Sequence, residues 1–233
     1  FRVLKRYSDA SKFIKDYIPN VLFSKGGFVS VPVVLAAKKC HVPIIIHESD
    51  MTPGLANRIC IPAAARVCCN FPETMQLLPA QKAVLSGSPI RKELLTGNKQ
   101  AALEFTGLNE KKPILMMMGG STGSKVINET LRKILPQLLK EFQVIHLCGK
   151  GNLDSTLIQE GYCQYEYISK ELKDLFAAAD IVLSRAGANA ICELLALKKP
   201  NIVVPLSAAD SRGDQILNAE SVRKQGFSYV LQE

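Results

Sequence analysis

Two glycine-rich turns are the segments best suited to bind an anion. The run GGSTG at residues 119–123 follows an apolar strand pattern that ends at Met118, and a helical pattern begins directly after it. Glycines let the backbone approach a phosphate closely, and the free N–H groups and dipole of the following helix favour negative charge. A second run, KGGFVS at residues 25–30, lies at the same kind of strand-to-helix junction. Both turns predict phosphate sites, although a tight turn can also require glycine for steric reasons alone.

The spacing of the glycines disfavours two common classes of nucleotide-binding protein. The sequence lacks the G-x-x-x-x-G-K-[ST] pattern of P-loop NTPases. It also lacks the G-x-G-x-x-G pattern of dinucleotide-binding dehydrogenases. We therefore expect a phosphate-bearing ligand of another class.

Two further segments place polar side chains near the start of predicted helices. The segment SRAGANAICE follows a strand pattern and ends at Glu193, whose carboxylate is suited to accept hydrogen bonds from ribose hydroxyls. In the segment DQILNA, Gln215 and Asn218 share one helix face, where their amides can bind sugar hydroxyls. Each has a structural alternative, namely an ion pair for Glu193 and helix capping or solvation for the two amides.

The pair His47 and Glu48 follows another strand pattern, at the edge of a sheet where ligands of α/β proteins bind. Imidazole and carboxylate groups carry out acid–base catalysis, so both residues are candidates for that role. A lone histidine is more often a satisfied core residue than a catalytic one. The sequence leaves both interpretations of His47 open.

Short apolar strand patterns alternate with helical patterns along the whole chain. Four strand candidates lie before Lys92, and six follow Pro113, near residues 114, 143, 164, 180, 202 and 228. This alternation predicts parallel sheets with crossover helices. We predict an α/β protein with two doubly wound Rossmann-like domains, of which the first is incomplete.

The predicted domain limits follow the strand patterns. We expect a first domain over residues 1–92, a polar linker over residues 93–112 and a second domain over residues 113–233. The chain begins at Phe1 within an amphipathic helical pattern, and the first domain has fewer strands than a complete doubly wound sheet. We therefore expect the beginning of the first domain to be missing from this chain.

Composition places the chain among folded proteins of the reducing cytoplasm. Hydrophobic residues make up 47% and charged residues 21% of the chain, which excludes general disorder. No apolar run approaches the roughly 20 residues that cross a bilayer, and no signal-peptide pattern is present. The seven cysteines have no C-x-x-C spacing and no paired histidines nearby, so we predict free thiols and no metal site.

The net charge of +8 belongs entirely to the first part of the chain. Residues 1–92 hold 13 Lys and Arg against 5 Asp and Glu, whereas residues 93–233 hold 16 of each kind. A basic region of this kind fits nucleic acid or the anionic headgroups of a cytoplasmic membrane leaflet. A solvated surface without a partner is the third interpretation.

Six segments in order resemble the MurG family of bacterial peptidoglycan glycosyltransferases. They are KGGFVSVP, HESDMTPGLAN, GSPIR, GGSTGS, SRAGANAICE and GDQILNA, and together they extend over nearly the whole chain. The resemblance implies the GT-B fold and an inverting transfer of N-acetylglucosamine from UDP to undecaprenyl-pyrophosphoryl-MurNAc-pentapeptide, which converts lipid I to lipid II. It implies no cofactor and no essential metal. It also implies a peripheral protein on the inner face of the cell membrane, with the basic half towards anionic lipid and no nucleic-acid partner.

The resemblance also implies a role for individual residues. Glu193 would bind the ribose of the donor, the backbone around Ile168 would meet the uracil, and Asp214 with Gln215 would bind the transferred sugar. The implied donor-binding residues are Arg91, Gly119, Gly120, Ser121, Ile168, Arg185, Gly187, Ala188, Glu193, Asp214 and Gln215. The implied acceptor-binding residues are Gly26, Gly27, His47, Glu48 and Asn57, among which His47 and Glu48 are also the catalytic candidates.

The chain departs from the family pattern in three places. The first glycine-rich turn of the family, whose histidine is often proposed as catalytic, has no counterpart here. The C-terminal helices that the family carries beyond the position of Glu233 have none either, and Ala190 stands where some members carry a hydroxyl residue. The resemblance therefore implies donor binding but leaves turnover by this chain open.

Other functions remain compatible with the sequence. One alternative is a different GT-B glycolipid glycosyltransferase or a UDP-N-acetylglucosamine 2-epimerase, and another is a non-catalytic protein that binds a nucleotide sugar. A nucleic-acid-binding protein would also explain the basic half, but the basic residues are not interleaved with the aromatic residues expected of that class.

Overall fold

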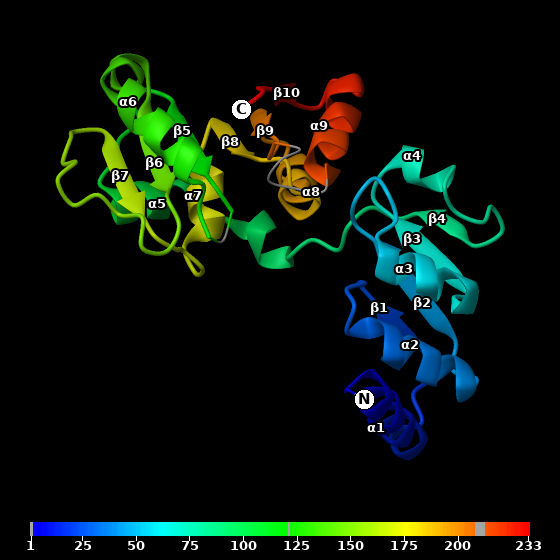
Figure 1. Cartoon of the computed structure of the whole chain (residues 1–233). Coiled ribbons are helices and arrows are strands. Elements are labelled where there is room, and N and C mark those ends of the chain that lie inside the picture. Colours follow the sequence, from blue (N-terminus) through cyan, green and yellow to red (C-terminus); the bar gives the residue numbers. More distant parts are fainter. Residues whose placement is uncertain (1, 121, 208–212) are drawn as a thin grey trace. The chain divides into compact units, whose positions relative to one another are not determined.

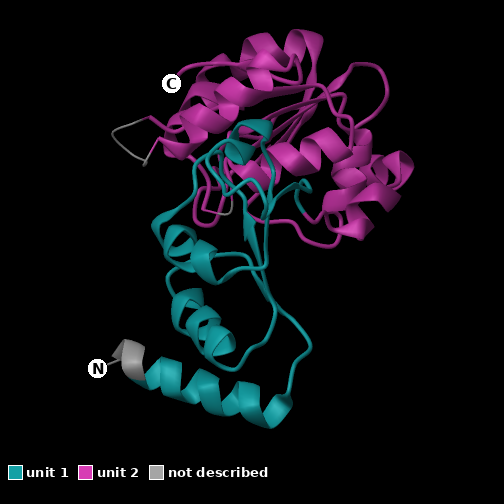
Figure 2. Cartoon of the chain, turned by 90° about the vertical axis from the view of Figure 1, so that its right-hand side faces the viewer, with its two compact units in different colours: residues 1–88 teal, residues 89–233 magenta. Residues whose placement is uncertain are grey.

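Two parallel sheets, one in each of two units, organise the chain (Figure 1). The structure is a computed structural model that describes residues 2–120, 122–207 and 213–233, with side chains from residue 5 onward. The chain divides into unit 1, Phe1–Ser88, and unit 2, Pro89–Glu233 (Figure 2). The two units are described separately below.

Unit 1 contains a parallel sheet in the order β1-β2-β3-β4. Its strands are β1 (Leu22–Ser24), β2 (Ile44–Glu48), β3 (Arg66–Cys69) and β4 (Ala83–Leu85). Its helices are α1 (Arg2–Tyr17), α2 (Ser30–Lys39), α3 (Leu55–Cys60), the 3-10 helix η1 (Ile61–Ala63) and α4 (Pro72–Met75). Aliphatic side chains of β2 and α2, such as Ile44, Ile46 and Val34, are fully buried and form the centre of the core. The sheet therefore fixes where the loops after β1 and β2 begin.

Unit 2 contains a parallel sheet in the order β10-β9-β8-β5-β6-β7. Its strands are β5 (Ile114–Met118), β6 (Gln143–Leu147), β7 (Tyr162–Tyr165), β8 (Ile181–Arg185), β9 (Asn201–Val204) and β10 (Tyr229–Val230). Its helices are η2 (Lys92–Thr96), α5 (Lys99–Thr106), α6 (Lys125–Glu141), α7 (Leu172–Ala178), α8 (Ala188–Ala196) and α9 (Asp214–Lys224). The chain builds outward from β5 through β6 to β7 and then returns to β8 on the other side. The loops after β5 and β8 therefore diverge at a switch point, where open α/β sheets bind ligands.

The structure confirms the predicted fold class and strand positions. Each of the six strand candidates after Pro113 is a strand, and the region before Lys92 contains the expected four among the described residues. The predicted amphipathic helix after the GGSTG turn is α6, which buries Ile127, Leu131 and Leu135. Apolar periodicity was therefore sufficient to find these elements.

The limits of the units differ from those predicted. The division follows Ser88, and the segment expected to be a linker forms η2 and α5 within unit 2. Leu94 and Leu103 of this segment are buried in the same core as α7. Gly97 passes so close to α7 that a Cβ there would lie 2.0 Å from the carbonyl oxygen of Lys173. The segment looks polar in sequence because only a few of its side chains reach the core.

A chain of buried side-chain hydrogen bonds joins α6 to β6 and β7. Asn128 donates from Nδ2 to the carbonyl oxygen of Cys148 at 2.8 Å, so its Oδ1 accepts from Nε2 of His146 at 2.9 Å. Nδ1 of His146 then accepts from the Tyr162 hydroxyl at 2.9 Å. Burial of this fully enclosed ring lowers the pKa of His146 to about 3. The ring is therefore neutral in the folded chain at neutral pH.

The remaining general features concern membrane spans, metal clusters and thiols. Within the described ranges, no helix has both the length and the apolar character needed to cross a bilayer. The same residues include no group of three His, Cys, Asp or Glu side chains arranged to hold a metal ion. All seven cysteines are free thiols, with Cys60, Cys69 and Cys148 buried and the others half-buried.

The neutral His146 makes stability depend on pH in a defined direction. Its pKa is about 3 in the folded chain against an ordinary 6.5, so the unfolded chain binds the additional proton. The stabilising contribution is complete above about pH 6.5 and falls by about 1.4 kcal/mol for each pH unit as pH decreases towards 3. Urea unfolding of the wild type and His146→Gln between pH 7.5 and 4.5 should show a shallower decline for the variant. Equal declines in both proteins would contradict this account.

Candidate functional site

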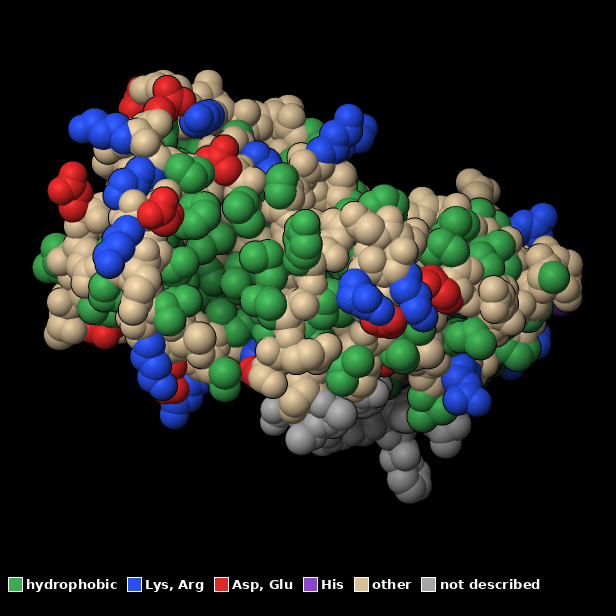
Figure 3. All heavy atoms as spheres, turned by 90° about the horizontal axis from the view of Figure 1, so that it is seen from above, with side chains coloured by type: hydrophobic (Ala, Val, Ile, Leu, Met, Phe, Trp, Pro, Cys, Tyr) green, Lys and Arg blue, Asp and Glu red, His purple; other side chains and the backbone are tan. Residues whose placement is uncertain are grey.

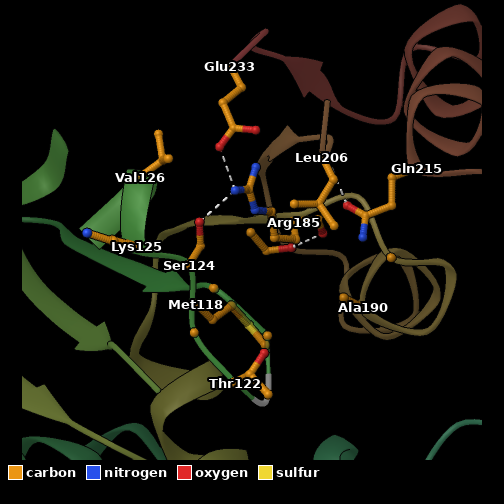
Figure 4. A pocket seen from close by; sticks show the side chains of 15 residues that line it. Met118, Thr122, Ser124, Lys125, Val126, Arg185, Ala190, Leu206, Gln215 and Glu233 are labelled. Carbon is orange, nitrogen blue, oxygen red and sulfur yellow. Dashed lines mark hydrogen bonds and ion pairs between the residues drawn. The ribbon is translucent and has the colours of Figure 1, made fainter. Parts of the chain in front are cut away.

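A pocket of about 560 Å³ lies at the switch point of unit 2 (Figure 4). Its walls are the loop after β5, the start of α6, the end of β8, the start of α8 and residues that follow β9 and β10. The lining residues are Met118, Gly119, Gly120, Thr122, Gly123, Ser124, Lys125, Val126, Ser184, Arg185, Gly187, Ala190, Leu206, Gln215 and Glu233. The pocket therefore occupies the position where parallel sheets of this topology bind their ligands.

The turn after β5 is closed so tightly that it requires glycine. A Cβ on Gly119 would lie 2.5 Å from the amide nitrogen of Ser124, and one on Gly123 would lie 2.1 Å from the carbonyl oxygen of Cys148. Gly120 and Gly123 also have φ angles of 88° and 78°, in the left-handed region. Ser124 caps α6 by accepting a hydrogen bond from the amide of Ile127 at 3.4 Å. The turn thus presents the backbone N–H groups of the first turn of α6 to the pocket.

A buried guanidinium forms part of the pocket wall. Arg185, at the end of β8, is 8% exposed and donates from Nη2 to Ser124 Oγ at 2.6 Å and to Glu233 Oε1 at 2.7 Å. Its Nη1 donates to the carbonyl oxygen of Val204 at 3.3 Å. Figure 4 shows Arg185 between Ser124 and Glu233. A fixed cation beside a helix N-terminus is suited to hold a phosphate group.

The predicted ribose-binding residue Glu193 is paired with Arg91 in unit 2. Arg91 donates from Nε and Nη2 to the two carboxylate oxygens of Glu193, at 3.1 and 3.3 Å. The Arg91 side chain is 46% exposed and that of Glu193 16%. A half-exposed pair of this kind contributes little to stability, so a ligand hydroxyl can compete for the carboxylate. The geometry matches the ion-pair alternative and is compatible with the ribose role.

The pocket brings together five of the residues predicted to bind the donor. These are Gly119, Gly120, Arg185, Gly187 and Gln215. Gln215 is anchored by its Oε1, which accepts from the amide of Leu206 at 3.2 Å.

The other predicted donor residues do not line this pocket. Ile168 packs against the core of unit 2, Ala188 is buried at the start of α8, and Asp214 is the first residue of α9. Arg91 and Glu193 form the separate pair described above. Ser121, also predicted to bind the donor, lies outside the described residues.

Sequence reasoning missed several residues that line the pocket. Ser124 carries a recognisable signal, because a serine directly before an apolar helical pattern is a common N-cap. Glu233 carries none, since nothing in its local sequence indicates that it meets Arg185. The partner of a buried arginine is a tertiary contact that spacing does not reveal.

In unit 1, His47 is enclosed and both of its ring nitrogens have partners. It is 1% exposed, and its Nε2 donates to the carbonyl oxygen of Gly87 at 2.9 Å. Its Nδ1 lies 3.3 Å from Nζ of Lys25 and 3.4 Å from Oγ of Ser49. Burial is the main cause that lowers the pKa of His47. This geometry supports the structural interpretation of the histidine.

Glu48 organises the loop that follows β2. Its Oε1 accepts from the amide of Asp50 at 3.1 Å, and its Oε2 accepts from the amide of Gly54 at 3.0 Å and from Nδ2 of Asn57 at 2.8 Å. Asn57 in turn faces Gly26, where a Cβ would lie 3.0 Å from Asn57 Oδ1. The predicted acceptor residues Gly26, Glu48 and Asn57 are therefore gathered at the carboxyl ends of β1 and β2.

The contact of Gly119 with Ser124 allows a test of the turn. Gly119→Ala places a Cβ against the backbone and should destabilise unit 2 by about 1–3 kcal/mol, as overpacking does. Gly187→Ala is the matched control, because Gly187 lines the same pocket with an extended backbone and open space around its Cα. Urea unfolding should find the control within about 1 kcal/mol of wild type. Similar values for the two variants would contradict the steric account.

Comparison with known proteins agrees with this architecture. Residues 114–233 match the glycosyltransferase family 28 C-terminal domain, and residues 1–69 match the N-terminal domain of that family. A curated relative from Lachnoclostridium phytofermentans, a UDP-N-acetylglucosamine--N-acetylmuramyl-(pentapeptide) pyrophosphoryl-undecaprenol N-acetylglucosamine transferase, is 67% identical over the whole chain. A protein with the same name from Lachnospira eligens is 61% identical. The chain spans 66% of the length of each of these two relatives.

Solved structures show the same fold. The crystal structure of Acinetobacter baumannii MurG superposes with a TM-score of 0.75 at 26% identity, covering 100% of this chain and 65% of that one. The UDP-GlcNAc 2-epimerase from Neisseria meningitidis has a TM-score of 0.68 at 13% identity, covering 99% of this chain and 69% of that one. The second likeness concerns the fold alone. The chain therefore belongs to glycosyltransferase family 28, and its two parallel α/β sheets are those of a GT-B-like fold.

Proposed function

We propose that this chain carries donor- and acceptor-binding parts of an enzyme that transfers N-acetylglucosamine from UDP-N-acetylglucosamine to undecaprenyl-pyrophosphoryl-MurNAc-pentapeptide. The observation that carries the proposal is the pocket at the switch point of unit 2, which is lined by a glycine turn, the start of α6 and Arg185. Identities of 61% and 67% to relatives whose names state this reaction support the choice of substrates. The 2-epimerase alternative has support from the fold alone, at 13% identity.

The donor diphosphate is placed at the turn after β5. Its oxygens would accept hydrogen bonds from the N–H groups at the start of α6 and meet the positive charge of Arg185. During transfer a hydroxyl oxygen of the acceptor attacks the anomeric carbon, the bond from that carbon to the diphosphate breaks, and UDP leaves with the electron pair. Fixed donors aimed at the leaving diphosphate stabilise the charge that develops on it. We therefore assign Arg185 and the turn to leaving-group stabilisation.

The nucleoside and sugar parts of the donor extend from this anchor. Glu193 would exchange Arg91 for the ribose hydroxyls, and the backbone around Ile168 would meet the uracil. Asp214 and Gln215, at the start of α9, would bind the transferred sugar. Binding then replaces a solvent-screened ion pair by hydrogen bonds from hydroxyl groups to a charged carboxylate.

The ribose assignment predicts a ligand-dependent effect of Glu193. The wild type should bind UDP about 5–10 times more tightly than 2′-deoxy-UDP, because the 2′-hydroxyl donates to a carboxylate. Glu193→Ala should weaken UDP binding about tenfold or more and abolish the difference between the two nucleotides. Calorimetric titration in the presence of a chelator measures both effects. Glu104→Ala, which removes an exposed carboxylate of α5, is the matched control and should behave as wild type.

Two outcomes would count against the donor assignment. One is a Glu193→Ala variant that still prefers UDP over its 2′-deoxy analogue. The other is a folded wild-type chain that binds UDP-glucose as tightly as UDP-N-acetylglucosamine, because the proposed sugar site must recognise the acetamido group.

We also propose that unit 1 contacts anionic lipid through α1. The helix exposes Phe13 and Tyr17, 65% and 71% accessible, and their rings stack with centroids 5.5 Å apart. Ile18 directly after the helix is 79% accessible. Unit 1 holds 11 Lys and Arg against 5 Asp and Glu. Exposed apolar side chains on a basic unit match a peripheral protein of the inner membrane face.

On the face drawn in Figure 3 the two signs of charge are mixed. Figure 3 shows acidic and basic side chains interspersed over the face seen there, with neither sign forming a continuous field. We therefore assign the membrane-facing role to α1, whose exposed aromatic residues support it.

A vesicle assay tests the membrane assignment. The double variant Phe13→Ser, Tyr17→Ser should bind vesicles that contain phosphatidylglycerol about tenfold more weakly, because two exposed aromatic anchors are lost. The control Phe227→Ser, Tyr229→Ser removes two exposed aromatic residues of unit 2, which are 52% and 80% accessible. Co-sedimentation should show wild-type binding for this control and weak binding of every protein to pure phosphatidylcholine. A loss that is equal in both double variants would contradict a specific role for α1.

A further inference from the structure

We infer that Lys25 is the cation that binds the diphosphate of the acceptor, and that His47 is a positioning residue that holds the Lys25 amine in place. This inference rests on the proposed function and adds to it a residue that neither the sequence motifs nor the comparisons assign. It also gives His47 a role other than general base.

The fold places the two side chains at one sheet edge. Lys25 is the first residue after β1, and His47 lies near the end of β2. The two strands are parallel neighbours, with Ser24 paired to Ile46. Nζ of Lys25 therefore reaches Nδ1 of His47, at 3.3 Å. No ion pair joins Lys25 to any carboxylate in the described part of the chain.

The hydrogen-bond partners fix which atom carries each proton. The carbonyl oxygen of Gly87 can only accept, so Nε2 of His47, 2.9 Å away, carries the ring proton. Nδ1 of the neutral ring then offers its lone pair to the ammonium of Lys25 at 3.3 Å, with the Ser49 hydroxyl at 3.4 Å as a second donor. Burial and the neighbouring Lys25 both lower the pKa of His47, which keeps the ring neutral. The amine of Lys25 is thus oriented by a neutral ring.

This arrangement leaves His47 poorly placed to accept a proton from a sugar hydroxyl. Its Nε2 is already protonated and bound to Gly87, and its Nδ1 is occupied by Lys25. The ring is also 1% exposed, so a substrate would have to displace Lys25 to reach it. Lys25, by contrast, is exposed to solvent.

The backbone next to Lys25 adds unpaired donors and one unpaired acceptor. Gly26 and Gly27, with φ angles of 89° and 82°, turn the chain into α2, and the amides of Gly27 and Phe28 make no hydrogen bond to the described parts of the chain. Oδ1 of Asn57, a residue 5% exposed, faces Gly26 and has no donor partner among the described residues. An ammonium, free amides and a buried acceptor suit a diphosphate joined to a hydroxyl-bearing sugar. The ligand class is thus a sugar or prenyl diphosphate.

The test measures diphosphate binding to unit 1 in the intact chain with the donor pocket filled. The chain is saturated with UDP and titrated calorimetrically with geranyl diphosphate, beside geranyl monophosphate. Lys25→Met removes the charge at similar length, Lys25→Arg retains it, and Lys38→Met removes an exposed lysine at the far end of α2. We expect geranyl diphosphate to bind about tenfold more weakly to Lys25→Met and within about threefold of wild type to the other two, since one charge-assisted contact is removed only in the first.

The role of His47 is separated from a folding effect by a second variant. His47→Gln should weaken geranyl diphosphate binding several-fold while leaving the affinity for UDP unchanged. The affinity for UDP reports whether unit 2 is intact. Thermal unfolding of the variant reports whether unit 1 is folded. Dependence on salt should also become shallower in Lys25→Met, since one cation no longer contacts the ligand.

The possible results divide clearly. Equal affinities of wild type and Lys25→Met for geranyl diphosphate, or no binding by the wild type, would overturn the assignment of Lys25. Undiminished binding by His47→Gln would overturn the positioning role of His47. Failure of the wild type to bind UDP would instead count against the proposed function, because the donor pocket contains neither residue.

Discussion

The buried guanidinium of Arg185 is the interaction on which the pocket of unit 2 depends. It leaves β8 and reaches the cap of α6 through Ser124, the end of β9 through Val204, and Glu233 after β10. Arg185 therefore connects the ends of β8 and β9, the start of α6 and the segment after β10 at one point. A buried charge is costly unless it is well paired, and removal of one partner leaves an uncompensated ion. The same contacts that make the fold tolerate this cation also hold it rigidly where an anion would bind.

The glycine turn depends on a second layer of contacts behind it. Gly123 lies against Cys148, and a Cβ on Gly149 would come within 2.4 Å of Gly123. Asn128 holds the Cys148 carbonyl, and the neutral ring of His146 holds Asn128. The turn therefore rests on a dry hydrogen-bonded platform and not on loop flexibility. Such preorganisation is what a site needs if its donors are to stabilise charge without reorganising during a reaction.

The sequence was sufficient for the sheets and the turns because these depend on local patterns. Apolar runs marked the strands, and glycines between a strand and a helix marked the two turns. Such local patterns could not predict contacts between residues that are far apart in sequence. Arg91 and Glu193 are 102 residues apart, and His47 and Gly87 are 40 residues apart. The segment of η2 and α5 was interpreted as a linker because strand patterns stop in it, yet Leu94 and Leu103 are buried. The sequence indicated candidate residues, whereas their hydrogen-bond partners and burial are visible only in the structure.

The two units hold positive charge in different ways, and the proposed reaction gives this difference a meaning. Arg185 is buried and bound by four acceptors, so its charge is fixed in orientation, as suits a group that must meet charge growing on a leaving diphosphate. Lys25 is exposed and held by one neutral ring. Its charge is solvated and adjustable, as suits a group that attracts and releases a diphosphate that stays intact through the reaction. A group that binds substrate and transition state equally adds affinity but not rate. Under the proposed reaction we therefore assign the lysine to recognition and the arginine to catalysis.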